Sequence, residues 1–222
     1  MDELIEKITV CIEKGKINKL SSYPGNMKGE DGADELSRLA LDKGIEPDAI
    51  LQACNEGMHS IGEKFSRNEV FVPELLMSAN AMKAVMVHLK PYFQLGSVKA
   101  KGRFILGTVS GDLHDIGKNL VAMVVEGDGW EVIDLGVDVK SAKFIQTIKE
   151  NPGCVVGLSA LLTTTMANMA KTVKEIKAQF PDTKIIVGGA PVSLDAAQKM
   201  GADSYSADPQ GAVTFLNQTI SV

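Results

Sequence analysis

One histidine between two aspartates is the clearest chemical feature of this sequence. Residues 108–119 read TVSGDLHDIGKN, so His114 follows Asp112 by two residues and directly precedes Asp115. On a curved loop, Asp112 can accept a hydrogen bond from one ring nitrogen of His114. Such a bond fixes the tautomer and makes the other ring nitrogen a better metal ligand. A structural zinc site needs about four protein ligands, so a metal on His114 would need further ligands, which a macrocycle could supply.

A loop histidine can also be only a hydrogen-bonded cap that holds no ligand. Two glycines near His114 favour the ligand interpretation. Gly111 and Gly117 permit unusual backbone angles and the close approach of a ligand, although glycine is common at turns of this kind.

The elements around His114 predict where it lies in the fold. Residues 103–109 (RFILGTV) are apolar, which is typical of a strand buried on both faces. From Ile116 to Val125 the apolar residues recur at three- and four-residue spacing, which predicts a helix. His114 is therefore expected on the loop after a strand, where open α/β sheets bind their ligands.

The second half of the chain continues this alternation. Further strands are predicted at 130–136, 154–159, 184–188 and 203–206, and further helices at 141–149, 165–180, 193–200 and 209–219. Such alternation predicts an α/β fold, a flavodoxin- or Rossmann-like doubly wound sheet of five parallel strands in the order 2-1-3-4-5. The loops after the first and third strands should then diverge and open a cleft beside His114.

The first half predicts an N-terminal four-helix bundle. Apolar residues recur at helical spacing in segments 3–14, 33–43, 47–65 and 73–89. The polar residues 16–32 are predicted to form a loop. A helical cap domain is thus expected over 1–91, a linker bounded by Pro and Gly over 92–102, and the α/β domain over 103–222.

The other two histidines are not expected to bind metal. His59 has Glu63 four residues on, which indicates a surface or helix-pair role. His88 lies near the predicted end of the fourth helix and suits the negative end of its dipole.

The loop around His114 resembles the signature of a known family. Residues 112–117 (DLHDIG) match the Asp-x-His-x-x-Gly motif of cobalamin-binding proteins of the methionine synthase and methanogen or acetogen corrinoid type. Residues 157–165 (GLSALLTTT) and 188–190 (GGA) are similar to its second and third cobalamin segments, and residues 62–79 resemble its helical cap. These four segments stand in the family's order within residues 47–220. Against the family's cap, the loop at 16–32 looks like an insertion.

The resemblance implies a cofactor and a set of residues that hold it. The implied cofactor is cobalamin, with His114 as the axial ligand to its cobalt. The implied cofactor-binding residues are Gly111, Asp112, His114, Asp115, Ile116 and Gly117 in the first loop, Ser159, Leu161, Thr163 and Thr165 in the second, Gly188 and Gly189 in the third, and Phe65 and Val72 in the cap.

These residues have different implied tasks. Phe65 and Val72 match the positions that lie over the upper face of the corrin. The hydroxyl groups of the second loop and the glycines of the third would line a slot for the displaced nucleotide tail. Ordinary strand-end and helix-capping roles explain the same Ser and Thr residues equally well. Thr165 stands where the family generally has a serine that extends the histidine–aspartate hydrogen-bond chain.

The function implied by the resemblance is a methyl carrier. Cobalt would accept a methyl group from a substrate-specific methyltransferase, and a second methyltransferase would pass the group to a thiol or pterin acceptor. A reductive activator of the corrinoid would be a further partner. We expect a non-catalytic subunit of a methyltransferase system, because 222 residues leave no room for a barrel of about 250 residues. Two alternatives are a cobalamin-sensing regulator or binding module without methyl transfer, and a flavodoxin-like module for another ligand.

Composition narrows the remaining choices. The chain has 23 basic and 28 acidic side chains, a net charge of −5, which argues against nucleic acid as a partner. No apolar run approaches the roughly 20 residues of a membrane span, and the N-terminus lacks the pattern of a signal peptide. Three widely spaced cysteines, Cys11, Cys54 and Cys154, are predicted to be buried thiols. A cytoplasmic location is expected.

Overall fold

The computed structural model of the protein describes residues 2–94 and 100–220. The chain divides into two compact units, one formed by residues 1–100 with 127–129 and one formed by residues 101–126 and 130–222. Each unit has its own core. In the part of the chain that the structure describes, no helix combines the length and the apolar character needed to cross a membrane.

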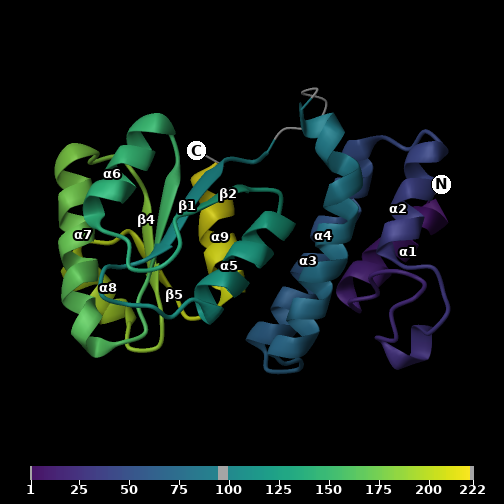
Figure 1. The fold of residues 1–222 in the computed structure, drawn as a ribbon, viewed down its shortest axis with the longest axis horizontal. Helices are drawn as coiled ribbons and strands as arrows, with labels where there is room; N and C mark the ends of the chain where they lie inside the picture. Colours follow the sequence, from purple (N-terminus) through teal and green to yellow (C-terminus); the bar gives the residue numbers. More distant parts are fainter. Residues whose placement is uncertain (1, 95–99, 221–222) are drawn as a thin grey trace. The chain divides into compact units, whose positions relative to one another are not determined.

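The first unit is the predicted helical bundle. Its helices are α1 (Asp2–Glu13), α2 (Ala33–Asp42), α3 (Pro47–Ser66) and α4 (Val72–Gln94), and α1 packs chiefly on α3 while α2 packs on α4 (Figure 1). Pro47 stands at the first turn of α3, where a proline costs no hydrogen bond. Residues Ile8, Ile12, Ile50, Leu75 and Leu89 are fully buried between the helices. Their burial confirms the apolar faces that the sequence indicated.

The fourth helix is longer than the sequence predicted. We expected it to end near Leu89, because proline removes a backbone donor and usually ends a helix. Instead α4 continues through Pro91 to Gln94. Pro91 and Val87 are exposed, so water can reach the carbonyl group that the proline leaves without a helical donor. Residues 92–94 of the predicted linker are thus helical, and residues 95–99 lie outside the described residues.

The two histidines of the bundle each contact a carboxylate. His59 lies on α3 with its Nε2 atom 3.3 Å from the Glu63 carboxylate, as the spacing of the two residues predicted. His88 does not act through a helix end, because α4 continues beyond it. Its Nε2 atom lies 2.6 Å from Asp34 on α2, so it ties α4 to α2.

The second unit is the predicted doubly wound sheet. Within the described residues its strands are β1 (Arg103–Thr108), β2 (Glu131–Asp134), β3 (Val155–Ser159), β4 (Ile185–Gly188) and β5 (Ser204–Ser206). All of the neighbouring pairs are parallel, and the order β2-β1-β3-β4-β5 confirms the prediction. The register pairs Thr108 with Ser159 and Ser159 with Gly188, so these three strands end at one edge.

Helices cover both faces of the sheet. Figure 1 shows α5 (Ile116–Gly127) and α9 (Pro209–Thr219) on one face, and α6 (Ser141–Glu150), α7 (Met166–Gln179) and α8 (Leu194–Met200) on the other. Alternate strand residues such as Ile105, Val156 and Val187 pack with Phe144 and Met169 from the second group of helices. Because both faces are covered, the three central strands β1, β3 and β4 are largely apolar and buried, as expected of parallel strands. The outer strands β2 and β5 carry polar residues and are only partly buried.

All three cysteines are buried free thiols, as predicted. Burial raises the pKa of the Cys11 thiol to about 11, although the nearby charge of Lys16 opposes that shift. A thiol of this kind is protonated near neutral pH and unreactive.

The packing of α1 on α3 leads to a stability prediction. A Cβ atom at Gly57 would lie 2.6 Å from the Thr9 carbonyl oxygen and 2.8 Å from Ile12 Cβ. Alanine gains about 1 kcal/mol of helix propensity over glycine, but overpacking costs about 1–3 kcal/mol. We expect Gly57→Ala to lower the free energy of unfolding by about 1 kcal/mol in urea titrations. The exposed neighbour Glu56→Ala is the control, and a stabilised Gly57→Ala protein would contradict this packing.

Candidate functional site

The site is centred on the fully buried carboxylate of Asp112. Its Oδ1 atom accepts hydrogen bonds from the backbone N–H of His114 at 3.1 Å and from His114 Nδ1 at 2.8 Å. Its Oδ2 atom accepts from three donors of the loop after β3: Leu161 N at 2.7 Å, Leu162 N at 3.2 Å and Thr165 Oγ1 at 2.8 Å. We call these five residues the Asp112 network. Both oxygens are used, so the carboxylate holds two loops together.

The network favours the ionised form of Asp112. Burial alone would raise its pKa, but the hydrogen bonds from His114, Leu161 and Thr165 outweigh burial and hold the pKa far below its usual range. Asp112 therefore remains a carboxylate at neutral pH and cannot donate a proton. Because an ionised carboxylate can only accept, Nδ1 of His114 is the donor in the 2.8 Å contact.

Local sequence explains why the first loop turns as it does. The amide of Asp112 donates to the Val109 carbonyl oxygen at 3.1 Å and closes a turn in which Gly111 has φ of +85°. Glycine adopts that angle without strain, as the sequence indicated. The buried Thr108 donates from Oγ1 to the His114 carbonyl oxygen at 2.9 Å, which fixes the far side of the loop.

The His114 ring is held on one side and open on the other. Half of its side chain is exposed, whereas the Asp112 side chain is fully buried. Within residues 2–94 and 100–220, no group of three His, Cys, Asp or Glu side chains could hold a metal ion. His114 can therefore offer a single nitrogen ligand, which fits a metal whose other ligands come from a macrocycle.

The remaining residues of the first loop lie around this ring. Leu113 and Ile116 are 73% and 80% exposed, so they form an apolar rim beside His114 in the sequence. The Asp115 side chain accepts from Asn119 Nδ2 at 3.0 Å and supports the start of α5. Gly117 lies inside α5 without a positive φ, so the prediction of an unusual backbone angle there is wrong. The space beside it is open, because a Cβ atom at this position would have no neighbour within 4 Å.

The second loop contains one hydroxyl group that binds Asp112 and others that bind no other part of the described chain. The hydrogen bond expected between Thr165 and Asp112 is present, and Thr165 is buried at the start of α7. Ser159 and Thr163 make no side-chain hydrogen bond with the described part of the chain, and Thr163 is exposed. Leu161 and Leu162 are 44% and 41% exposed and extend the apolar rim. These side chains are available to a ligand.

Steric contacts with neighbouring segments explain the glycines of the third loop. Gly189 has φ of +123°, and a Cβ atom there would lie 1.8 Å from the Ala160 carbonyl oxygen. At Gly188 a Cβ atom would lie 3.0 Å from the Ser206 carbonyl oxygen. The close approach of neighbouring chain segments therefore requires glycine at 189 and favours it at 188. A slot for the nucleotide tail at these positions stays a prediction.

Phe65 and Val72 belong to the helical unit. Phe65 lies near the end of α3 and is half-buried, and Val72 begins α4 and is 38% exposed. Their predicted place over a corrin depends on the relative placement of the two units, so it stays a prediction.

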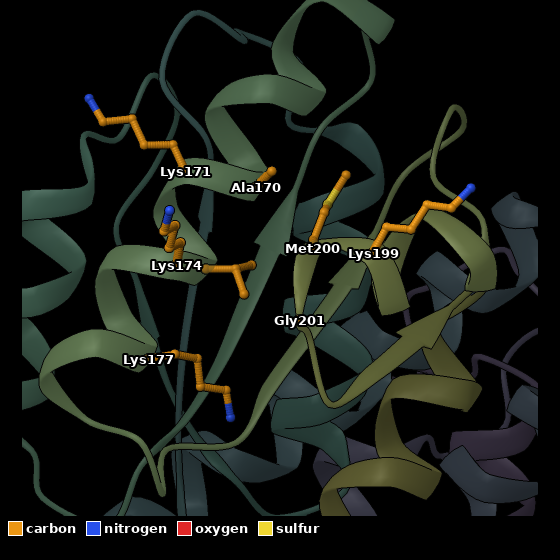
Figure 2. Close-up of a pocket in the computed structure, with 8 residues that line it drawn as sticks. Ala170, Lys171, Lys174, Lys177, Lys199, Met200 and Gly201 are labelled. Carbon is orange, nitrogen blue, oxygen red and sulfur yellow. The ribbon is translucent and has the colours of Figure 1, made fainter.

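A cavity of about 500 Å³ lies away from this network, between α7 and α8. Figure 2 shows Lys171, Lys174 and Lys177 on one helix, with Lys199 and Met200 on the other. Lys177 donates to the Thr183 carbonyl oxygen at 2.9 Å and to Asp203 at 2.7 Å, and both partners precede strands. The cavity is therefore near the end of the sheet where β4 and β5 begin, opposite the edge that carries His114.

Two residues that support the first loop were not expected from the sequence. Asp138, in the loop after β2, accepts from Gly111 N at 2.7 Å and from Ser110 Oγ at 3.1 Å. These two hydrogen bonds lower the pKa of Asp138. Asn168 on α7 donates from Nδ2 to the Ser110 carbonyl oxygen at 2.7 Å. The predicted strand order contained one useful signal, because it places the loop after β2 beside the loop after β1.

Known proteins share this architecture. The chain matches a B12 binding domain family over residues 102–214 and a second B12 binding domain family over residues 29–90. It is similar to the trimethylamine corrinoid protein of Methanosarcina barkeri, with 38% identity over 195 residues that cover 86% of this chain and 90% of the relative.

Two solved structures are similar over nearly the whole chain. The first is a cobalamin-binding protein from Desulfitobacterium hafniense DCB-2, with a TM-score of 0.77, 30% identity, and coverage of 97% of this chain and 98% of that chain. The second is the methanol:cobalamin methyltransferase complex MtaBC from Methanosarcina barkeri, with a TM-score of 0.81, 26% identity, and coverage of 99% and 80%.

The fold, the Asp112 network and these matches define a cobalamin-binding protein with a helical cap. More narrowly, the chain belongs to the family of corrinoid proteins of methyltransferase systems. Its cofactor is cobalamin, as the sequence predicted.

The Asp112 network predicts a pH-dependent contribution to stability. Asp112→Asn places an amide N–H₂ among existing donors, so we expect the free energy of unfolding at pH 7 to fall by about 2 kcal/mol. The folded pKa lies below the unfolded value of about 3.9. The contribution is therefore complete above that value and is lost as pH falls below it.

Urea unfolding from pH 8 to pH 3, followed by circular dichroism, measures this difference. The gap between wild type and variant should be constant down to about pH 5 and shrink below about pH 4. Asp115→Asn is the matched control, since this exposed carboxylate accepts a side-chain bond from Asn119 and from no other residue that the structure describes. A gap that widens in acid would contradict the network.

Proposed function

We propose that His114 is the axial protein ligand to the cobalt of cobalamin, and that this chain carries a methyl group between methyltransferases. The observation that supports His114 most directly is its asymmetric environment. Nδ1 is held by the buried Asp112, while the ring is half exposed. When bound, the corrinoid supplies a cobalt ion that can accept a methyl group and give it up again.

The chain's own groups prepare His114 for that ligand. Asp112 keeps the proton on Nδ1, so Nε2 is the ligating atom, and the carboxylate's charge makes it a stronger donor. Thr165 and the amides of Leu161 and Leu162 hold the carboxylate in place.

The other predicted residues surround this ligand with complementary chemistry. The exposed apolar rim of Leu113, Ile116, Leu161 and Leu162 can cover the apolar part of a macrocycle. The Ser159 and Thr163 hydroxyls, beside Gly188 and Gly189, are proposed to line the slot for the nucleotide tail. Phe65 and Val72 are proposed to shield the opposite face of the ring from water.

The partners follow from the carrier role. The similarity to the methanol:cobalamin methyltransferase complex supports a methyltransferase as one partner. We propose that it loads the methyl group, that a second methyltransferase passes this group to a thiol or pterin, and that a reductive activator restores the cofactor. A location in the cytoplasm, where these proteins would meet, is part of the same proposal.

Electron paramagnetic resonance tests the ligand directly. In protein that holds cob(II)alamin, a histidine nitrogen on cobalt splits the hyperfine lines into triplets, which become doublets after nitrogen-15 labelling of histidine. The chain has three histidines. We expect the isotope effect to vanish in His114→Ala and to persist in the controls His59→Ala and His88→Ala. Unchanged splitting in labelled wild type would mean that no histidine binds cobalt.

A methyl-transfer assay tests the carrier role. Because a carrier does not bind the donor itself, the cobalamin-loaded chain alone should not consume methanol or a methylamine. Addition of the matching methyltransferase should start methyl transfer to the chain, and His114→Ala should slow later transfer to an acceptor. We would follow the cofactor's visible absorbance. Consumption of the donor by the chain alone would contradict the carrier role.

A further inference from the structure

We propose that Asp138, assisted by Asn168, is a positioning residue that fixes the first loop so that His114 can bind cobalt. The inference rests on the proposed function of His114. Neither residue lies in the motif segments 112–117, 157–165 and 188–190, and both bind the loop through Ser110 or Gly111. Both act on residues 110–112, just before the histidine.

Asp138 binds the first loop from the loop after β2, the strand next to β1. Its Oδ1 atom accepts from Gly111 N at 2.7 Å and from Ser110 Oγ at 3.1 Å. Its own amide donates to the Asp112 carbonyl oxygen at 3.0 Å. Asp138 alone thus binds three consecutive residues of the first loop, Ser110, Gly111 and Asp112.

The backbone of Asp138 is set for this task. Its φ of +52° lies in the left-handed region, which non-glycine residues other than Asn and Asp rarely adopt. The next residue, Val139, is buried and pairs with Val109 by a parallel bridge. The loop after β2 is therefore anchored to the end of β1, and the side chain of Asp138 reaches the turn from that anchor.

Asn168 holds the same turn from the other side. Its Nδ2 atom donates to the Ser110 carbonyl oxygen at 2.7 Å, and it lies on α7, the helix that follows Thr165. A Cβ atom at Gly111 would lie 3.4 Å from this amide nitrogen. The turn is thus held between the loop after β2 and the first turn of α7.

These contacts divide the loop into a fixed part and an exposed part. From Ser110 to Asp112, four backbone groups are bound. Asn168 binds the Ser110 carbonyl, Asp138 binds the Gly111 amide and the Asp112 carbonyl, and Val109 binds the Asp112 amide. The Leu113 side chain that follows is 73% exposed, and His114 is half exposed. Asp112 therefore keeps its place, and with it the hydrogen bond that orients the exposed imidazole. We call the hydrogen bonds of Asp138 and Asn168 with residues 110–112 the clamp. Loss of the clamp would let Asp112 shift, and the His114 imidazole would lose its alignment.

Three substitutions at position 138 separate the effect of losing the hydrogen-bond acceptor from the effect of backbone strain. Asp138→Ala removes the acceptor and places a strained residue at positive φ. Asp138→Gly removes the acceptor without strain. Asp138→Asn keeps an oxygen acceptor and tolerates the left-handed conformation. Asn168→Ala tests the second contact. Glu150→Ala, an exposed carboxylate at the end of α6 that binds Gln146, is the matched control.

The readout is histidine ligation in protein loaded with cob(II)alamin, not activity. We expect Asp138→Ala and Asp138→Gly to lose most of the nitrogen-15 effect and to bind hydroxocobalamin about 10-fold more weakly. Asp138→Asn and Glu150→Ala should resemble wild type, and Asn168→Ala should fall between. Thermal unfolding of the apoproteins checks that every variant is folded.

The outcomes distinguish this inference from the proposed function. If His114→Ala abolishes the isotope effect but Asp138→Gly leaves ligation and affinity unchanged, the clamp is wrong and the ligand assignment stands. If wild type shows no isotope effect, both are overturned. If Asp138→Gly binds like wild type while Asp138→Ala does not, strain and not the lost acceptor is responsible, and the positioning role fails.

Discussion

The site depends on the hydrogen bonds that five donors make to the buried carboxylate of Asp112. Asp112 has no exposed surface, and such a charge is costly unless donors surround it. Here three backbone amides, one hydroxyl and one imidazole provide them. The donors come from two loops, so the carboxylate is ionised and placed only if both loops fold. The orientation of His114 is therefore coupled to the end of β3 and the start of α7.

The parallel sheet makes this coupling available. β1 and β3 are neighbours although a strand and two helices separate them in sequence, and their paired residues Thr108 and Ser159 end at one edge. β2 lies on the other side of β1 and brings Asp138 to the same turn. One strand order thus supplies both the network that orients the histidine and the clamp that holds the turn. The exposed leucine and isoleucine side chains remain free for a macrocycle.

Several features followed from the sequence because they depend on local pattern. Apolar residues at a 3.6-residue period located the helices, and short continuous apolar runs located the buried strands. The alternation of strands and helices favoured the observed sheet order. The spacing of Asp112 and His114 determined their hydrogen bond, since two residues on one turn cannot be far apart. The length of α4 was misjudged because Pro91 was expected to end the helix, whereas α4 tolerates this exposed proline near its end.

Only the tertiary structure decided which distant groups complete the site. The amides of Leu161 and Leu162, and the side chains of Asp138 and Asn168, carry no sequence pattern that distinguishes them from ordinary loop residues. Their role comes from where parallel strands place them. The requirement for glycine at 189 likewise arises from the Ala160 carbonyl oxygen, a contact between two strand ends. The sequence alone identified His114 and its hydrogen-bond partner Asp112, because both lie on one loop. The packing of neighbouring loops decided what holds them.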